Sequence, residues 1–163
     1  MKHSTLRVLA AILAVLTLTV CFAACNTSSE VDYYFQTEGG VKIAIGADEA
    51  DFLDKLGKPL SENSSASCGG FEGKDYVYSF KGFRVSTTPA EDGQVVSKIE
   101  LTDDSVKTPE GLYVGMSRED AEAAMKGKNS DSTGGNLIYS SENTKLQVII
   151  RDDSVAGIVY VAK

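Results

Sequence analysis

The chain has few of the side chains from which active sites are usually built. Its one histidine, His3, lies near the N-terminus, and there is no tryptophan. Residues 25–163 therefore have no imidazole for a Ser-His-Asp or Cys-His mechanism, or for a zinc site that needs one. No Ser-x-x-Lys sequence occurs, which removes the simplest serine–lysine pair. We expect a protein that is not an enzyme.

A calcium interpretation of residues 129–136, NSDSTGGN, fails at its last ligand. Asn129, Asp131, Thr133 and Gly134 fall at the first, third, fifth and sixth positions of an EF-hand-like loop. The twelfth position should be a bidentate glutamate but is a serine, and no pair of helices flanks the segment. An ordinary loop is the better interpretation, and we expect neither a metal nor a cofactor.

The N-terminus has the pattern of an export signal. Lys2 and Arg7 precede an apolar run, residues 8–20, that is too short to span a membrane. The Ala-Ala-Cys sequence that ends at Cys25 resembles the bacterial lipobox, in which the cysteine is lipidated and becomes the first residue of the mature chain. Cys21 follows a bulky valine and fits less well. An ordinary secretory signal, with Cys25 as a bystander, is the alternative.

Lipidation of Cys25 predicts both organisation and location. Residues 1–24 are the expected signal peptide, and residues 25–32 are the lipidated cysteine and its tether. The chain carries a net charge of −7, which argues against nucleic acid and against electrostatic docking to anionic lipid. We therefore expect a protein on the extracytoplasmic face of the cell membrane, held there by its lipid.

Cys68 is the remaining cysteine of the chain body. In an exported chain it has no partner for an internal disulfide unless Cys25 is unlipidated. It could be a reactive or partner-bridging thiol, or a small buried apolar residue. No nearby histidine or helix start would lower the pKa of its thiol, so the sequence favours burial.

Two similar helix starts predict an internal duplication. Residues 45–58, IGADEADFLDKLGK, and residues 114–127, VGMSREDAEAAMKG, both run from an Ile/Val-Gly strand end into a helix with an Asp or Ser cap. Three alternating segments follow each helix, at 75–80, 83–88 and 95–102 and then at 136–141, 145–151 and 155–163. We predict two tandem β-α-β-β-β repeats, 33–104 and 105–163, in an α+β fold with the helices on one face of an antiparallel sheet.

These motifs resemble a known repeat. The strand ending in Val/Ile-Gly, the capped helix, the Gly57-Lys58-Pro59 stop and the three strands resemble the unit of the β-lactamase-inhibitor-protein-like (BLIP-like) fold. The helix start is similar to that of the SmpA/OmlA outer-membrane assembly lipoproteins. Two such repeats behind a lipobox also resemble small, mostly uncharacterised lipoproteins of Gram-positive bacteria. The resemblance covers residues 33–163 and implies a sheet with one open face, but it assigns no inhibitory residues.

Period-two alternation assigns the strand residues to two faces. The predicted core residues are Phe83, Val85, Ile99, Leu101, Leu146, Val148, Ile150, Ile158 and Tyr160. The opposite face is the candidate partner-binding face, and its residues are Arg84, Lys98, Gln147, Ile149, Arg151, Val159 and Val161. An ordinary solvated sheet face is the alternative.

The sequence as a whole favours a non-catalytic, lipid-anchored envelope protein that binds another protein. A small-ligand or peptide-binding lipoprotein is the main alternative, and a large closed pocket between the repeats would favour it. Inhibition of a secreted hydrolase is a third possibility that rests on fold analogy alone.

Overall fold

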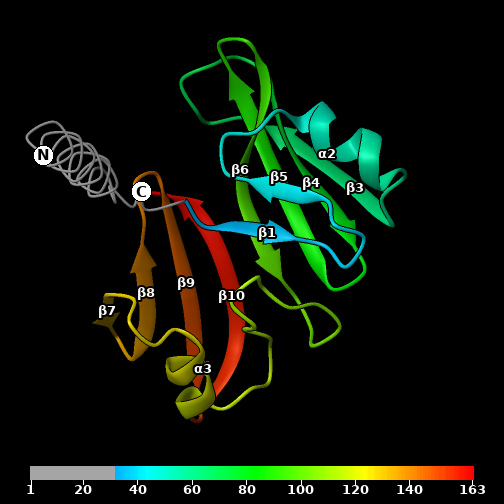
Figure 1. Ribbon diagram of the computed structural model, residues 1–163. Coiled ribbons are helices and arrows are strands. Elements are labelled where there is room, and N and C mark those ends of the chain that lie inside the picture. Colours follow the sequence, from blue (N-terminus) through cyan, green and yellow to red (C-terminus); the bar gives the residue numbers. More distant parts are fainter. Residues whose placement is uncertain (1–31) are drawn as a thin grey trace, which may run out of the picture.

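The computed structural model describes residues 32–163, and this part of the chain is mostly β-structure. Strands β1 (Tyr34–Gln36) and β2 (Lys42–Ala44) form a two-stranded sheet. The other strands form an eight-stranded antiparallel sheet in the order β3-β4-β5-β6-β10-β9-β8-β7 (Figure 1). They are β3 (Ser61–Ala66), β4 (Lys74–Phe80), β5 (Phe83–Ala90), β6 (Gly93–Leu101), β7 (Ser130–Thr133), β8 (Asn136–Ser140), β9 (Thr144–Arg151) and β10 (Ser154–Ala162).

The predicted α+β, BLIP-like class is wrong, because the described chain has only two short helices. Helix α2 (Glu49–Leu56) has eight residues and α3 (Arg118–Ala124) has seven. Gly57, at φ 72°, and the proline two residues later end α2 after about two turns. Residues 112–115, predicted as a strand, are irregular. The opening strands β1 and β2 pair only with each other and do not join the large sheet.

Each half contributes four strands to the large sheet, where three were predicted after each helix. The additional strands are β3 and β7, at the two edges of the sheet. Every residue of both strands is exposed. Because neither strand buries a face, neither shows the hydrophobic alternation that reveals a strand in a sequence. The segment of β7 was predicted to be an ordinary loop, and no strand was predicted at β3.

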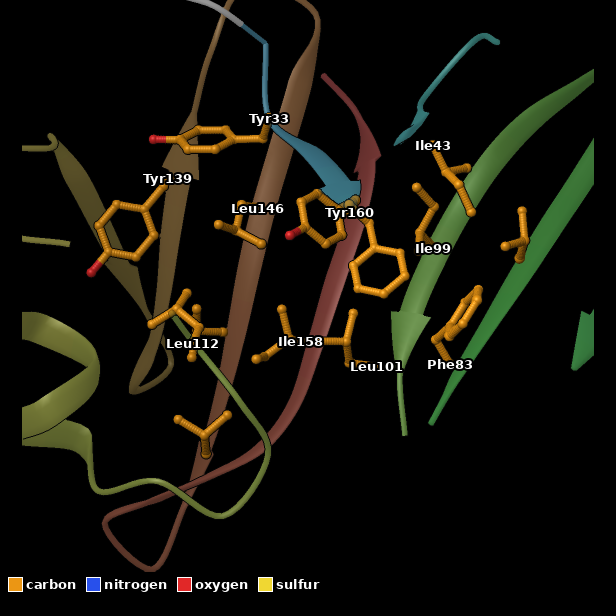
Figure 2. Close-up of a cluster of buried hydrophobic side chains, with 14 of the residues drawn as sticks. Tyr33, Ile43, Phe83, Ile99, Leu101, Leu112, Tyr139, Leu146, Ile158 and Tyr160 are labelled. Carbon is orange, nitrogen blue, oxygen red and sulfur yellow. The ribbon is translucent and has the colours of Figure 1, made fainter. Parts of the chain in front are cut away.

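The core lies on one face of the large sheet, as the alternation predicted. Of the nine predicted core residues, eight are buried, and Ile150 is half-buried against them. The register aligns them in cross-strand rows, so that Val85 pairs with Ile99, Ile99 with Tyr160 and Tyr160 with Leu146. Figure 2 shows these side chains projecting from β6, β10 and β9 toward the same side.

The small sheet and both helices cover this core face. Phe35 of β1 and Ile43 of β2 are fully buried, and the Phe35 ring centroid lies 4.8 Å from that of Phe83. In Figure 1 β1 crosses over the middle of the large sheet. Phe52 of α2 and Ala121 of α3 belong to the same core cluster. The opposite face of the large sheet receives none of these elements.

The same backbone contact joins each helix start to the sheet. In the first half, the N–H of Gly46 donates to the carbonyl of Val96 at 2.8 Å, and the N–H of Val96 donates to Ala47 at 2.9 Å. In the second half, Gly115 donates to Val155 at 2.7 Å, and Val155 donates to Met116 at 2.9 Å. Both glycines have positive φ, 80° and 96°, which glycine adopts without strain.

The predicted signal peptide (1–24), the lipidated Cys25 and the tether up to residue 31 lie outside the described residues. Within residues 32–163, neither helix has the length and apolar character needed to cross a membrane.

Candidate functional site

The open face of the large sheet carries one uninterrupted row of residues across all eight strands. The row runs from edge to edge through paired positions: Ser61, Ser79, Arg84, Glu100, Val159, Gln147, Ile138 and Asp131. A second row beside it contains Asn63, Val77, Ser86, Lys98, Val161, Lys145 and Ser140. We call the residues of these two rows on β5, β6, β9 and β10, together with Ile149 and Arg151, the open face.

The structure brings the seven predicted residues to this face. Arg84, Lys98, Val159, Val161 and Gln147 lie together in the two rows. Ile149 lies at an irregularity, where its partner is Gly157 of β10 and the register shifts. Arg151 is exposed at the far end of β9, opposite Ser154, and is therefore peripheral.

Glu100 compensates part of the positive charge of the open face. Its Oε2 lies 3.9 Å from Nη1 of Arg84 and 3.8 Å from Nζ of Lys98. All three side chains are about a third or more exposed, so these ion pairs add little to stability. Alternation along β6 puts Glu100 on the same face as Lys98, but it does not show that this one carboxylate lies near two cations.

Three further residues belong beside the predicted set. Lys145 pairs with Val161 in the second row, Ile138 extends the first row beyond Gln147, and Val77 lies opposite Ser86. The alternation in the segments around them was recognisable, so period two alone could have found these three. Within the described chain, Lys145 and Arg151 have no carboxylate within 4.0 Å.

The centre of the open face is apolar. Val159 and Val161 on β10, and Ile149 on β9, are each half-buried rather than covered. Their β-branched side chains are held by neighbours in the same rows and lose little conformational entropy on binding. The arrangement is therefore an apolar centre with four cations and one carboxylate around it, on a chain whose net charge is −7.

A polar cluster on the opposite face fixes α2 against the sheet. The hydroxyl of Thr87, which is buried, donates to Oε2 of Glu49 at 2.6 Å, and Nε2 of Gln94 donates to the Thr87 hydroxyl at 3.2 Å. Burial, and then the neighbouring Glu49, raise the pKa of Tyr78 above its usual range. The two bonds of Thr87 join α2 to β5 and β6.

A shallow groove lies beside the core face. About 400 Å³ of space opens between the β1–β2 turn, the end of α2, the β4–β5 turn and the segment after β6. Its lining residues include Val41, Leu56, Phe80, Phe83 and Val106, with Lys55, Lys81 and Glu38 among the polar ones. The groove is open to solvent and lies within the first half and the segment after it, so it is not the closed pocket between repeats that a ligand-binding protein would show.

Asp32, the last residue of the predicted tether, is tied to the second half. Its Oδ1 accepts from the Asn143 N–H at 2.8 Å and from the Ser141 hydroxyl at 2.7 Å, and its Oδ2 accepts from Asn143 Nδ2 at 2.7 Å. These bonds, first of all that from the Asn143 N–H, lower the pKa of Asp32 to about 2. The chain therefore enters the domain at the β8–β9 turn.

Two remaining candidates carry no visible chemistry. Cys68 is exposed, so the expectation that it is buried is wrong: the segment that contains it is a surface turn between β3 and β4. Among residues 32–163, no group of three or more His, Cys, Asp and Glu side chains could hold a metal ion. Asp131 and Thr133, two of the calcium-loop residues considered above, lie in β7.

The described chain is thus an antiparallel sheet protein with one covered and one open face. No protein-family model matches it, and no curated protein matches its sequence. Similar solved structures include an extracellular protein with an SCP domain from Bacillus anthracis str. Ames, at 19% identity and a TM-score of 0.50. That match covers 86% of this chain and 48% of the other, so this chain spans about half the length of that protein.

Two other structures resemble it more weakly. A DUF4309 family protein (YjgB) from Bacillus subtilis subsp. subtilis str. 168 matches 76% of this chain and 83% of its own, with 16% identity and a TM-score of 0.43. The uncharacterized protein yfeY from Escherichia coli matches 80% and 99%, with 12% identity and a TM-score of 0.45. None of the three is described as BLIP-like or as an SmpA/OmlA protein, so that resemblance stays a prediction.

Proposed function

We propose that this chain is a non-catalytic, extracytoplasmic protein-binding module, anchored through a lipid on Cys25, whose open face receives an envelope protein. The observation that carries the proposal is the open face itself: half-exposed Val159, Val161 and Ile149 lie at the centre of an eight-stranded face that no described element covers. Contiguous apolar surface of this kind is typical of interaction sites.

The positive charge around that apolar centre indicates the kind of surface that a partner would carry. Arg84, Lys98, Lys145 and Arg151 surround the apolar residues, and Glu100 is the one carboxylate among them. A partner with an acidic rim around an apolar contact would complement this face, and the rim charges would mainly steer its association. The rest of the chain is acidic, so such a partner is directed to this face and away from others.

Capture by chemical crosslinking in native membranes tests the proposal. The test variant is Lys98→Gln/Lys145→Gln/Arg151→Gln, which removes three charges from the open face and leaves Arg84 paired with Glu100. The matched control is Lys58→Gln/Lys126→Gln/Lys128→Gln, which removes three exposed charges elsewhere. We expect one protein that wild type and control both capture and that the test variant loses. Equal capture by all three would place the contact elsewhere.

A second candidate function is the binding of a small apolar ligand in the groove beside α2. It is favoured by the space of about 400 Å³ and by the five apolar side chains that line it. A fluorescent apolar probe, anilinonaphthalene sulfonate, should then bind the wild type and not a Val106→Asp variant. No binding to the wild type would remove this candidate. Hydrolase inhibition was expected only by analogy with the BLIP-like fold, and that analogy no longer supports it.

A further inference from the structure

The two outer strands of the large sheet are protected to different degrees. Strand β7 has four residues, and Lys126 and Lys128 stand just before it. Strand β3 has six residues, pairs with β4 without a bulge from Ser61 to Ala66, and contains neither lysine nor proline. Short length, lysine, proline and bulges are the usual means of preventing edge strands from pairing with other chains. Within Ser61–Ala66, β3 has none of them, and its greater length is what distinguishes it from β7, since Lys58 and Pro59 stand before β3 as Lys126 and Lys128 stand before β7.

The backbone of β3 presents unused hydrogen-bonding groups to solvent. The N–H of Ser67 donates to the carbonyl of Gly73 at 3.1 Å, which continues the β3–β4 ladder by one position. Alternate residues of an antiparallel strand point to the same neighbour, so Asn63 and Ser65 direct their backbone groups to β4 as well. It follows that Glu62, Ser64 and Ala66 direct their N–H and C=O groups away from the sheet.

Exposed apolar side chains stand at both ends of this edge. In the described chain, the large hydrophobic residues that remain exposed are Leu60, at 77%, and Phe71, at 49%. Leu60 immediately precedes β3, and Phe71 lies in the turn that follows it. The longer of the two sheet edges and the exposed apolar residues therefore coincide, and each is a separate indication of a contact.

We propose that β3 pairs antiparallel with β3 of a second copy of this chain, with Ser64 opposite Ser64. This register pairs Glu62 of each copy with Ala66 of the other, so all three outward-pointing residues are used and about six backbone hydrogen bonds form. The two Glu62 side chains do not oppose each other, which avoids repulsion across the strands.

The same register joins the apolar ends. Leu60, whose N–H donates to the carbonyl of Ser79 at 2.8 Å, ends the paired segment of each copy and comes to lie near the turn of the other copy that carries Phe71. The contact occurs twice because the pairing is two-fold symmetric, which is the usual form of a homodimer interface. This self-complementarity favours a second copy over an unrelated extended peptide.

The pairing keeps the two open faces on the same side, because its two-fold axis is perpendicular to the sheet. The result is one sixteen-stranded sheet with two copies of the proposed binding face. A partner with two acceptor sites would bind such a dimer with higher avidity than a monomer. The dimer itself does not depend on the proposed function, since it uses the strand edge and not the open face.

Disulfide trapping in native membranes tests the register. In a Cys68→Ser background, Ser64→Cys would place two cysteines at a hydrogen-bonded pair, where Cα atoms are about 5.5 Å apart and a disulfide can form. Mild oxidation should yield a crosslinked dimer. Ser65→Cys, which lies opposite Asn63 and not opposite itself, and Ser132→Cys on the β7 edge are the controls, and each should yield at least about tenfold less. Equal yields for all three, or a crosslink to a different protein, would overturn the proposal.

Sedimentation of the full chain, purified from membranes in detergent, tests the contact without a new cysteine. Ser64→Pro removes an N–H that points outward, so it costs no hydrogen bond inside the chain. It should weaken dimerisation at least about tenfold, and Leu60→Ser should weaken it by a smaller factor. A wild-type chain that is monomeric at every concentration would contradict the proposal, as would dimerisation that neither substitution changes. If Ser64→Pro fails to fold, the Leu60→Ser variant and the disulfide-trapping yields still test whether β3 pairs with a second copy.

Discussion

The two halves of the molecule use the same backbone contact and different side chains. In each half a glycine with positive φ pairs with the last strand of its own half, and a short helix begins three residues later. Behind that contact the first half packs aromatic rings. The ring of Phe80 contacts those of Phe52 and Phe83, and Phe52 also contacts Tyr78. The second half packs Leu112, Leu146 and Val148 together with Tyr139 and Tyr160.

The contact between each helix start and the sheet is therefore defined by main-chain geometry, whereas the side chains of the core behind it can differ. Hydrophobic packing is non-directional, so rings and aliphatic chains fill the same space with modest adjustment. A carbonyl and an N–H, by contrast, must meet within about 3 Å. Whether the halves arose by duplication stays a prediction.

The largest difference between the halves should be found at the helices. Phe52 is the fully buried side chain of α2, and Phe52→Ala should lower the free energy of unfolding by about 3–5 kcal/mol. The residue of α3 that aligns with Phe52 is Ala121, so the buried side chain available for truncation there is Met125, just after α3, and Met125→Ala should cost about 2–3 kcal/mol. Urea denaturation of both variants measures the difference. A Phe52→Ala loss below that of Met125→Ala would show that α2 does not anchor its half.

The two junction glycines should behave alike. An added Cβ meets nothing within 4 Å at Gly46 or Gly115, so alanine there costs only the strain of positive φ, about 1–2 kcal/mol each. Gly70→Ala, where φ is not positive and the space is also open, is the control and should change stability little. Unequal costs for Gly46→Ala and Gly115→Ala in thermal unfolding would show that the backbone contact is not equivalent in the two halves.

The two helix caps should also contribute differently to the free energy of unfolding, by a smaller amount than the buried side chains. The Ser117 hydroxyl accepts from the Asp120 N–H at 3.1 Å and donates to Oδ2 of Asp120 at 2.7 Å, whereas Asp48 makes no side-chain cap bond. Ser117→Ala should cost about 1 kcal/mol. Asp48→Ala loses only a favourable charge at the helix start and should cost about 0.5 kcal/mol. Equal losses would indicate that the cap bond of Ser117 contributes nothing.

The smallest effect concerns the bonds that tie the entering chain to the second half. The folded-state pKa of Asp32, about 2, lies below its ordinary value of 3.8. The carboxylate therefore stabilises the fold above pH 3.8, and this contribution is lost as the pH falls toward 2. Asp32→Asn should remove that part of the pH dependence, while Asp54→Asn on the exposed side of α2 should not. Identical stability profiles between pH 2 and 5 for wild type and Asp32→Asn would contradict the assignment.

Alternation made the central strands predictable. The segments around Val85, Ile99, Leu146 and Tyr160 bury every second residue, and for this reason both the core and the membership of the open face followed from the sequence. The edge strands β3 and β7 could not be predicted, because their residues are polar and exposed on both sides. The fold class was wrong partly because β1 and β2 alternate as sheet strands do but pair only with each other.

The binding surface was only partly predictable. Alternation places Arg84, Glu100 and Lys98 on one face, and Lys98 is two residues from Glu100 on β6. The approach of Arg84 to Glu100 depends on the register of β5 and β6. That register is set by long-range pairing, which no local pattern contains. Exposure of Leu60 and Phe71 at the ends of β3 likewise needed the strand to be located first.

The most direct test of the central claim is photocrosslinking from single positions in native membranes. A photoreactive amino acid at position 159 lies at the centre of the open face, and one at position 54 lies on the exposed side of α2, which packs on the other face. The proposed function predicts a crosslinked partner protein from position 159 and none from position 54. A partner reached from position 54, with nothing captured from position 159, would contradict it.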